Sequence, residues 1–210
     1  MNLTNSQRVV KLAGNLLSNP GLIPPYLKHN VFSKKYPIDW KMPWWSYRAI
    51  EYVDTIVGNK TIFEYGTGGS TVRFASKAKS IVAVEDDEKW MEMVQDRLKK
   101  LGINNVEIHF RPFDFHNPAG YEQSEYLRLM EIVVGDFDIV IIDGQDHTFR
   151  ERIRCFHYVE PRMKAGQYII VDDFWRYEEL LKDNRAKEVK VFESVGPCRF
   201  GVTSTAVFIY

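Results

Sequence analysis

Thr61–Thr71 constrains the fold of this chain more than any other stretch, because it joins a strand pattern to a glycine turn. Residues 61–63 are β-rich, three glycines follow between 66 and 69, and Ser70–Lys77 has the pattern of a helix start. Glycines allow positive φ and let the backbone approach a ligand closely. The free N–H groups of the following helix point at whatever lies over the turn. The stretch therefore predicts a strand, a tight turn and a helix, with a ligand site above the turn.

A second predicted strand, Ser80–Val84, ends in the acids Glu85 and Asp86. Glu85 follows the first glycine by about twenty residues, the spacing at which a carboxylate accepts hydrogen bonds from a ribose bound over the turn. Nicotinamide or flavin dinucleotides and S-adenosylmethionine both fit such a unit. Dinucleotide sites use G-x-G-x-x-G, and here Thr71 stands at the third glycine. The glycine pattern therefore counts against a dinucleotide.

Glu64 precedes Gly66 by two residues, which gives the motif Glu-x-Gly-x-Gly-Gly. On this motif the chain resembles the class I S-adenosylmethionine-dependent methyltransferases. In that family the acid and the turn receive the methionine end of the cofactor, and the acid after the next strand receives the ribose. The resemblance implies ribose contacts from Glu85 and Asp86. It implies contacts with the methionine end from Glu64, Gly66, Thr67, Gly68, Gly69 and Ser70.

The length of 210 residues supports one well-buried core and is too short for two ordinary enzyme domains with a linker. Asn5 or Ser6 can cap an amphipathic helix that ends at Asn19-Pro20-Gly21, and the proline-containing segment 22–40 predicts an extended connector. We therefore expect residues 1–45 to form an N-terminal helix and connector packed on a methyltransferase domain over residues 46–210.

The charges balance at 28 Lys plus Arg against 28 Asp plus Glu, so electrostatics gives no reason to expect nucleic acid or a membrane surface. We expect a small-molecule methyl acceptor, no nucleic-acid partner and no membrane insertion. No apolar run reaches the length of a membrane span, and the first residues lack a signal-peptide core, which predicts a cytoplasmic protein. Cys155 and Cys198 are interpreted as packing residues.

Carboxylates close two further predicted strands, Phe137–Ile142 and Gly166–Val171. The first ends in Asp143, which we expect to face the cofactor cleft and to contact the cofactor, and the second ends in Asp172 and Asp173. Parallel strands deliver such residues to one edge of an open α/β sheet, where ligands bind. Between the two strands, residues 148–158 have the pattern of a helix.

The same three aspartates match the metal ligands of the divalent-metal-dependent O-methyltransferases. The resemblance implies Mg²⁺ or another divalent cation at Asp143, Asp172 and Asp173, and hard oxygen ligands suit that cation. The alternative is structural: Asp173 caps a helix near Phe174 and Asp172 bonds to backbone. That group places a lysine three residues after the first aspartate, whereas this chain has Asp146.

His147 follows. Either side chain could take a proton from a hydroxyl, but a neutral imidazole needs the smaller pKa shift to act near pH 7. We therefore predict His147 as the catalytic base, with Asp143 orienting the acceptor; a capping or packing role is the alternative. In the resembled family an acid just past the third strand, here Val106–Phe110, often binds the adenine amino group. That implies Asp114, with a solvated loop residue as the alternative.

Four aromatic residues, Trp40, Trp44, Trp45 and Tyr47, precede the glycine turn. Their large rigid faces can floor a ligand pocket, or they can attach the N-terminal segment to the sheet. At the other end of the chain, Glu188–Ser194 and Ser204–Tyr210 are two β-rich segments joined by a short loop, so they must run antiparallel. An ordinary dinucleotide-binding domain would lack this hairpin.

These features together predict a three-layer, Rossmann-like, doubly wound α/β fold. Its seven-stranded sheet is mostly parallel with an antiparallel C-terminal hairpin. The predicted function is S-adenosylmethionine-dependent methyl transfer to a small molecule, onto a hydroxyl oxygen. Two alternatives stay open: an NAD(P)-binding oxidoreductase, and a catalytically silent cofactor-binding module of the same fold.

Overall fold

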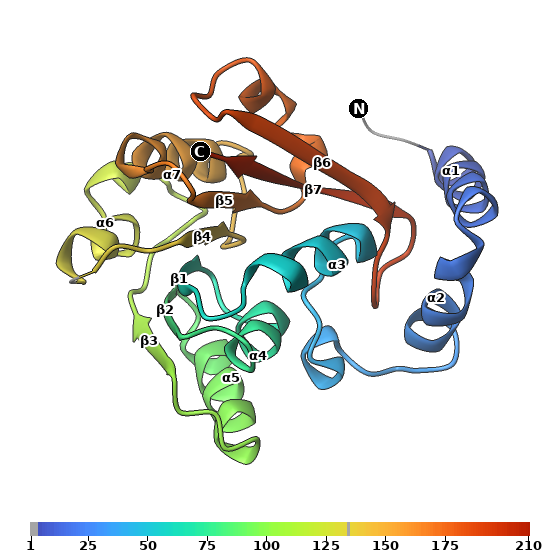
Figure 1. The fold of residues 1–210 in the computed structure, drawn as a ribbon, viewed down its shortest axis with the longest axis horizontal. Helices are drawn as coiled ribbons and strands as arrows, with labels where there is room; N and C mark the ends of the chain where they lie inside the picture. Colours follow the sequence, from blue (N-terminus) through green and yellow to red (C-terminus); the bar gives the residue numbers. More distant parts are fainter. Residues whose placement is uncertain (1–3, 134) are drawn as a thin grey trace.

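The structure, a computed structural model, describes residues 4–133 and 135–210. A seven-stranded sheet runs through the molecule in the order β3-β2-β1-β4-β5-β7-β6 (Figure 1). The neighbours from β3 to β5 pair in parallel, and β7 is antiparallel to both β5 and β6, so the predicted fold class is confirmed. The strands are β1 (Thr61–Tyr65), β2 (Ser80–Glu85), β3 (Val106–Phe110), β4 (Ile139–Ile142), β5 (Tyr168–Val171), β6 (Glu188–Val195) and β7 (Val202–Ile209).

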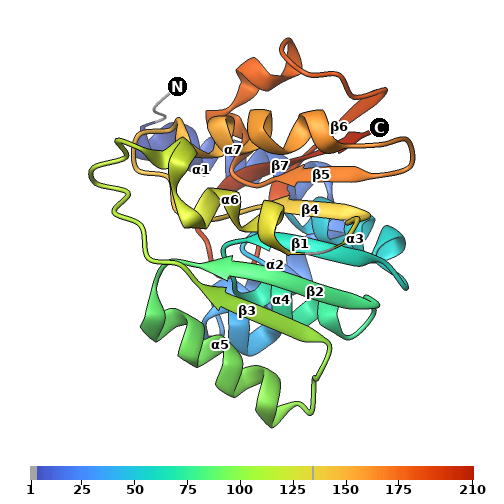
Figure 2. The same cartoon turned by 90° about the vertical axis from the view of Figure 1, so that its left-hand side faces the viewer.

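Helices cover both faces of the sheet (Figure 2). One face packs against α3, α4 and α5, and the opposite face against α6 and α7. The α-helices are α1 (Asn5–Ser18), α2 (Ile23–Asn30), α3 (Tyr47–Ile56), α4 (Gly69–Ala75), α5 (Glu88–Lys100), α6 (Glu125–Ile132) and α7 (Glu151–Val159). Short 3-10 helices are η1 (Pro20–Leu22), η2 (Pro37–Trp40), η3 (Tyr121–Gln123), η4 (Glu160–Arg162), η5 (Phe174–Arg176) and η6 (Glu178–Leu181).

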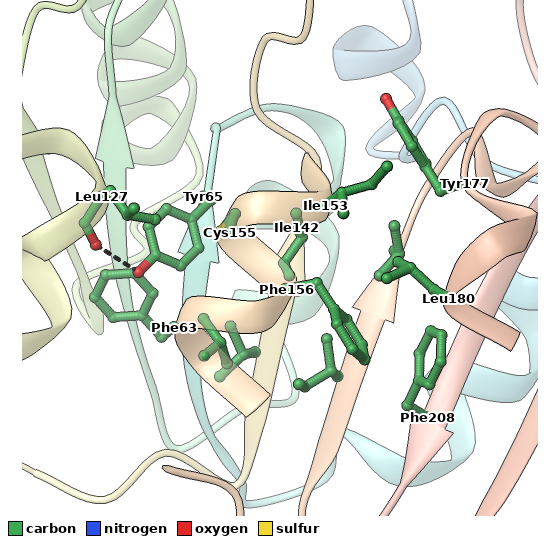
Figure 3. Close-up of a cluster of buried hydrophobic side chains, with 14 of the residues drawn as sticks. Phe63, Tyr65, Leu127, Ile142, Ile153, Cys155, Phe156, Tyr177, Leu180 and Phe208 are labelled. Atoms are coloured by element: carbon green, nitrogen blue, oxygen red, sulfur yellow. Dashed lines mark hydrogen bonds between the residues drawn. The ribbon is translucent and has the colours of Figure 1, made fainter. Parts of the chain in front are cut away.

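Each central strand is buried on both faces, which explains its continuous apolar run. Ile62 faces α3 and α4, whereas Phe63 faces α6 and α7, and neither side chain is exposed to solvent. Burial of each such side chain contributes roughly 1.5–3 kcal/mol. Figure 3 shows the cluster under α6 and α7, where the Tyr65 hydroxyl donates a hydrogen bond to the Leu127 carbonyl at 2.8 Å.

The sheet places a ligand site between β1 and β4. Strand order reverses there, because the chain moves outward from β1 to β3 and then returns to pair β4 with β1. In open α/β sheets, the crevice outside the carboxyl ends of the strands at this reversal is where ligands bind. The glycine turn and Asp143 follow these two strands directly.

The N-terminal segment differs from the predicted extended connector. It contains η1, α2 and η2, because Pro24 and Pro25 lie in the first turn of α2, where a helix needs no N–H donor. The predicted amphipathic helix is α1, but it begins at Asn5 because Thr4 is its N-cap, rather than Asn5 or Ser6 as predicted. Residues 1–3 lie outside the described part, and the domain division at residue 45 stays a prediction.

Two helices are shorter than their sequence patterns. The pattern of residues 122–134 predicts one helix, with Tyr126, Leu127 and Met130 as apolar positions. The structure has η3 followed by α6 there, and Val134 lies outside the described residues. The helix predicted at 148–158 begins only at Glu151, because the Glu151 carboxylate accepts hydrogen bonds from the N–H and hydroxyl of Thr148. Within residues 4–133 and 135–210, every helix is too short or too polar to cross a membrane.

Candidate functional site

A cavity of about 640 Å³ lies at the carboxyl ends of β1, β2, β4 and β5. This volume falls within the range of small-molecule sites. Its wall includes most of the predicted site residues, contributed by the glycine turn and by the acids that end the next strands. These are Gly66, Thr67, Gly68, Gly69, Ser70, Glu85, Asp86, Asp143, Asp172 and Asp173.

The glycine turn is packed so closely that side chains do not fit. Gly66 has a φ of +83°, and a Cβ there would lie 2.7 Å from the Cα of Gly144. A Cβ on Gly69 would lie 1.8 Å from the carbonyl oxygen of Met42. Backbone from the N-terminal segment and from β4 thus holds the turn from two sides, which explains why glycine occupies these positions.

Glu64 lies beneath the turn and does not belong to the described cavity wall. Its fully buried carboxylate accepts hydrogen bonds from the Ser70 hydroxyl and, at 2.7 Å, from the Thr71 hydroxyl. Thr71 in turn accepts a hydrogen bond from the N–H of Gly68 at 2.9 Å. Burial raises the pKa of Glu64 to about 8, although the two hydroxyls oppose the shift. Glu64 therefore supports the turn, and its predicted contact with the cofactor stays a prediction.

Glu85 and Asp86 reach the cavity from the end of β2. Glu85 accepts hydrogen bonds from the N–H and hydroxyl of Thr67, at 2.8 and 2.5 Å, which ties it to the turn. The Oδ1 atom of Asp86 is buried and has no hydrogen-bond partner among residues 4–133 and 135–210. Burial and the neighbouring Glu85 charge raise the pKa of Asp86 to about 7. An orphaned acceptor in a cavity wall is the atom that a ligand hydroxyl or amine would satisfy.

Asp143, at the end of β4, is held on both carboxylate oxygens. The Trp45 indole donates to Oδ2 at 2.8 Å, and Nη2 of Arg152 lies 3.2 Å from Oδ1. Arg152 also donates to the carbonyl oxygens of Gly144 and Asp172, each at 2.9 Å, so it joins the ends of β4 and β5. Burial raises the pKa of Asp143, although Arg152 and Trp45 oppose the shift.

The two aspartates after β5 have different partners. Asp172 is buried and accepts a hydrogen bond from the Thr205 hydroxyl at 2.6 Å; burial and the nearby Asp143 charge raise its pKa well above the ordinary value. Asp173 accepts from Arg199 at 3.0 Å and from Thr203 at 3.2 Å. Burial opposes ionisation of Asp173, but the surrounding arginines outweigh it and lower its pKa.

The predicted metal site at Asp143, Asp172 and Asp173 does not fit this arrangement. Their oxygens already accept hydrogen bonds from arginine, indole and hydroxyl donors, and guanidinium groups supply the positive charge. Mg²⁺ requires several free oxygen ligands in near-octahedral geometry. Within the described part of the chain, no group of three or more His, Cys, Asp or Glu side chains could hold a metal ion.

Asp114 and His147 lie outside the cavity wall as the described residues form it. Asp114 is exposed, and its carboxylate accepts a hydrogen bond from the N–H of His116 at 3.0 Å, so the solvated-loop alternative describes its position. His147 is also exposed, and its ring stacks on that of His116 with a centroid distance of 4.2 Å. The predicted base and the predicted adenine ligand thus do not line the described cavity, and their roles stay predictions.

Several cavity residues were not predicted as site residues. Asp146 lines the cavity and accepts hydrogen bonds from the N–H groups of Arg150 and Arg152, each at 3.2 Å. Burial raises its pKa. The sequence did mark Asp146, because it stands where the resembled group has a lysine. The arginines of the wall are Arg152, Arg176 and Arg199, and no sequence motif identified them.

The aromatic segment combines both of its predicted roles. Trp45 is fully buried, packs against Phe74 at a centroid distance of 5.5 Å and attaches the N-terminal segment to the sheet. Trp44 is half exposed and lines the cavity, with its indole donating to the Cys198 carbonyl at 2.9 Å. Trp45 also donates its hydrogen bond to Asp143, so the residue that attaches the N-terminal segment also supports a site residue.

No protein-family model matches the chain, and neither does any curated protein. Solved structures do match. An O-methyltransferase from Bacillus cereus in complex with S-adenosylhomocysteine is 16% identical, with a TM-score of 0.63 over 90% of this chain and 97% of that one. The O-methyltransferase TomG from Streptomyces achromogenes, involved in tomaymycin synthesis and bound to S-adenosylmethionine, is 15% identical, with a TM-score of 0.62 over 90% and 96%.

An rRNA methylase from Streptococcus thermophilus also matches, at 14% identity and a TM-score of 0.56 over 84% of this chain and 98% of that one. The similar structures thus include methyltransferases with different acceptors. The chain has the fold of the class I S-adenosylmethionine-dependent methyltransferases.

Proposed function

We propose that this chain binds S-adenosylmethionine and transfers its methyl group to a hydroxyl oxygen of a small molecule. One observation carries the proposal: the unsatisfied Asp86 oxygen lies in a cavity above a tightly packed glycine turn, at the sheet reversal of a methyltransferase fold. The solved structures from B. cereus and S. achromogenes, which hold the cofactor product and the cofactor, support it.

The chain's residues fit the cofactor in two regions of the wall. The backbone of Gly66–Gly69 offers a close approach for the methionine part, because no side chain intervenes. Asp86 offers a free acceptor for a ribose hydroxyl, while Glu85 keeps Thr67 and the turn in place. Glu64 acts one layer below, through Ser70 and Thr71.

When bound, S-adenosylmethionine supplies an electrophilic methyl group, so the chain must hold an acceptor in line and remove a proton. A base must lie within hydrogen-bond reach of the hydroxyl it deprotonates. Asp146 lines the cavity and its pKa is raised by burial, whereas His147 is exposed outside it. We therefore propose that the Asp146 carboxylate takes the proton from the acceptor hydroxyl and that Asp143 orients the acceptor.

A small-molecule acceptor is favoured over nucleic acid because the chain carries no net charge, although one similar structure is an rRNA methylase. We also place the reaction in the cytoplasm. Cys155 and Cys198 are both free thiols in the described structure, as is usual for proteins of a reducing compartment.

Calorimetric titration with S-adenosylhomocysteine tests the cofactor site. At about pH 8.5, above the pKa of about 7 of Asp86, the wild type should bind it, and Asp86→Asn should lose about tenfold or more in affinity, because a charged hydrogen-bond acceptor becomes a neutral amide. Asp96→Asn is the matched control, since Asp96 is exposed on α5 and pairs with Lys100. A folded wild-type sample that binds NAD and not S-adenosylhomocysteine would establish the oxidoreductase alternative instead.

A further inference from the structure

Arg176 is a cavity residue that the proposed reaction does not yet use. It ends η5, directly after β5, and its side chain is 27% exposed at the cavity wall. Its guanidinium lies over the rings of Phe149 and Trp175, at 4.8 and 4.9 Å from the ring centroids. Two aromatic faces therefore hold this cation in place by cation–π contact.

The Arg176 guanidinium lacks hydrogen-bond partners within the described residues. Its Nε is buried and unpartnered, and the nearest carboxylate oxygen, Oδ2 of Asp173, lies 3.7 Å from Nη2, beyond hydrogen-bond distance. Guanidinium has five N–H donors, and leaving buried donors unsatisfied costs free energy. A fixed guanidinium with open donors is suited to a ligand oxyanion.

The other two arginines of the wall are already engaged. Arg152 donates to three backbone carbonyl oxygens, those of Asp143, Gly144 and Asp172. Arg199 donates to the Trp44 carbonyl at 2.8 Å and to Asp173 at 3.0 Å. Asp173 accepts a hydrogen bond from Arg199, whereas Arg176 lies 3.7 Å from Asp173 as an ion pair without a hydrogen bond, so the N–H donors of Arg176 stay open to a ligand.

The position of Arg176 indicates the acceptor rather than the cofactor. Asp86 follows β2 and Arg176 follows β5, and the strand order β2-β1-β4-β5 separates them by three strand spacings, about 14 Å. The proposed ribose contact lies at the β2 end of the cavity, and the glycine turn, which follows β1, lies between Asp86 and Arg176. The end of the cavity at Arg176 is thus free for the molecule that receives the methyl group.

We propose that the methyl acceptor carries a carboxylate or phosphate group and that Arg176 binds this oxyanion. This inference rests on the proposed function, because it assumes that the cavity near β5 holds the acceptor. The two anion types share the chemistry that Arg176 recognises, namely oxygen atoms that accept paired N–H bonds.

Nuclear magnetic resonance tests the proposal without knowledge of the acceptor. The indole N–H signal of Trp175, assigned through Trp175→Phe, is followed during titrations with benzoate and with inorganic phosphate. The ring of Trp175 contacts the guanidinium, so an anion on Arg176 should shift this signal. The protein is first saturated with S-adenosylhomocysteine, whose binding is measured separately by calorimetry.

The proposal expects a saturable shift in the wild type and at least about a tenfold loss of affinity in Arg176→Gln. Arg176→Lys should be intermediate, because it keeps the charge without the planar fork. Arg150→Gln is the matched control, since Arg150 is exposed and pairs with Glu179, and it should behave as wild type. The probe with the higher affinity identifies the kind of anion.

Absence of a saturable shift with both probes, or an unchanged titration in Arg176→Gln, would overturn the proposal. If S-adenosylhomocysteine binds in the same sample, the failure concerns Arg176 alone and the proposed methyl transfer stands. If it does not bind, the proposed function fails, and the titrations still report whether Arg176 is an anion site.

Discussion

Glu64 should control the stability of the folded chain near neutral pH. Its pKa is about 8 in the folded chain, against an ordinary value of 4.5, because the carboxyl is buried beneath the glycine turn. Between these two pH values the folded chain keeps a proton that the unfolded chain has lost. The contribution of Glu64 to the free energy of unfolding therefore falls as pH rises, by about 1.4 kcal/mol per pH unit.

Glu64→Gln should remove this dependence. Glutamine is nearly isosteric with a protonated glutamate, cannot ionise, and can pair with the hydroxyls of Ser70 and Thr71. Across the full interval from 4.5 to about 8 the lost contribution amounts to about 5 kcal/mol. We therefore expect the free energy of unfolding of the variant, relative to that of the wild type, to increase steadily as pH rises through this interval.

Urea unfolding at a series of pH values measures the difference. Glu51→Gln, at an exposed position of α3, serves as the control and should run parallel to the wild type. If the free energies of unfolding of Glu64→Gln and wild type changed in parallel with pH, the conclusion that Glu64 is protonated in the folded chain would be wrong. The same variant tests its role: a supporting residue predicts retained affinity for S-adenosylhomocysteine, whereas a direct contact predicts a loss.

Three further predictions concern the turn, the base and the metal. Gly69→Ala should destabilise the fold by about 1–3 kcal/mol or more in urea unfolding, since its Cβ would meet the Met42 carbonyl. Gly14→Ala, in helix α1 with no described atom within 4 Å of a new Cβ, should instead stabilise by up to about 1 kcal/mol. With an acceptor in hand, Asp146→Asn should lower kcat by about 10²–10⁴-fold and His147→Asn should not, as initial rates will show. Calorimetry with Mg²⁺ should give no binding heat, and prior chelation should leave the affinity for S-adenosylhomocysteine unchanged; a metal-dependent affinity would contradict the arginine-paired carboxylates.

The fold was readable from the sequence because its signals are local. Apolar runs such as Ile139–Ile142, glycines after strands and a short C-terminal loop each depend on neighbouring residues. The exception is the segment before α3, where prolines were interpreted as extended chain. Pro24 and Pro25 instead begin α2, because proline is compatible with the first turn of a helix and not with its interior.

The site was less predictable because its contacts join distant parts of the chain. Trp45 and Asp143 are 98 residues apart, and Met42 covers a turn that lies well after it in sequence. Spacing indicated which strand ends carry acids, and Glu85, Asp86 and Asp143 do line the cavity. It could not indicate the direction of loop side chains, and so Asp114 and His147 were assigned to a cavity that they do not reach.

The predicted metal does not fit the site because the buried aspartates already have a counter-charge. Acids at the ends of β4 and β5 must be neutralised when buried, by a cation or by protonation. Either a divalent ion or a set of guanidinium groups can neutralise these acids. The positions of the aspartates in the sequence do not distinguish the two. Here the charge comes from Arg152 in α7 and Arg199 between β6 and β7, neither of which neighbours the acids in sequence. Because these arginines are fixed by carbonyl contacts, they leave Arg176 as the cation of the described cavity wall that is free to meet an acceptor.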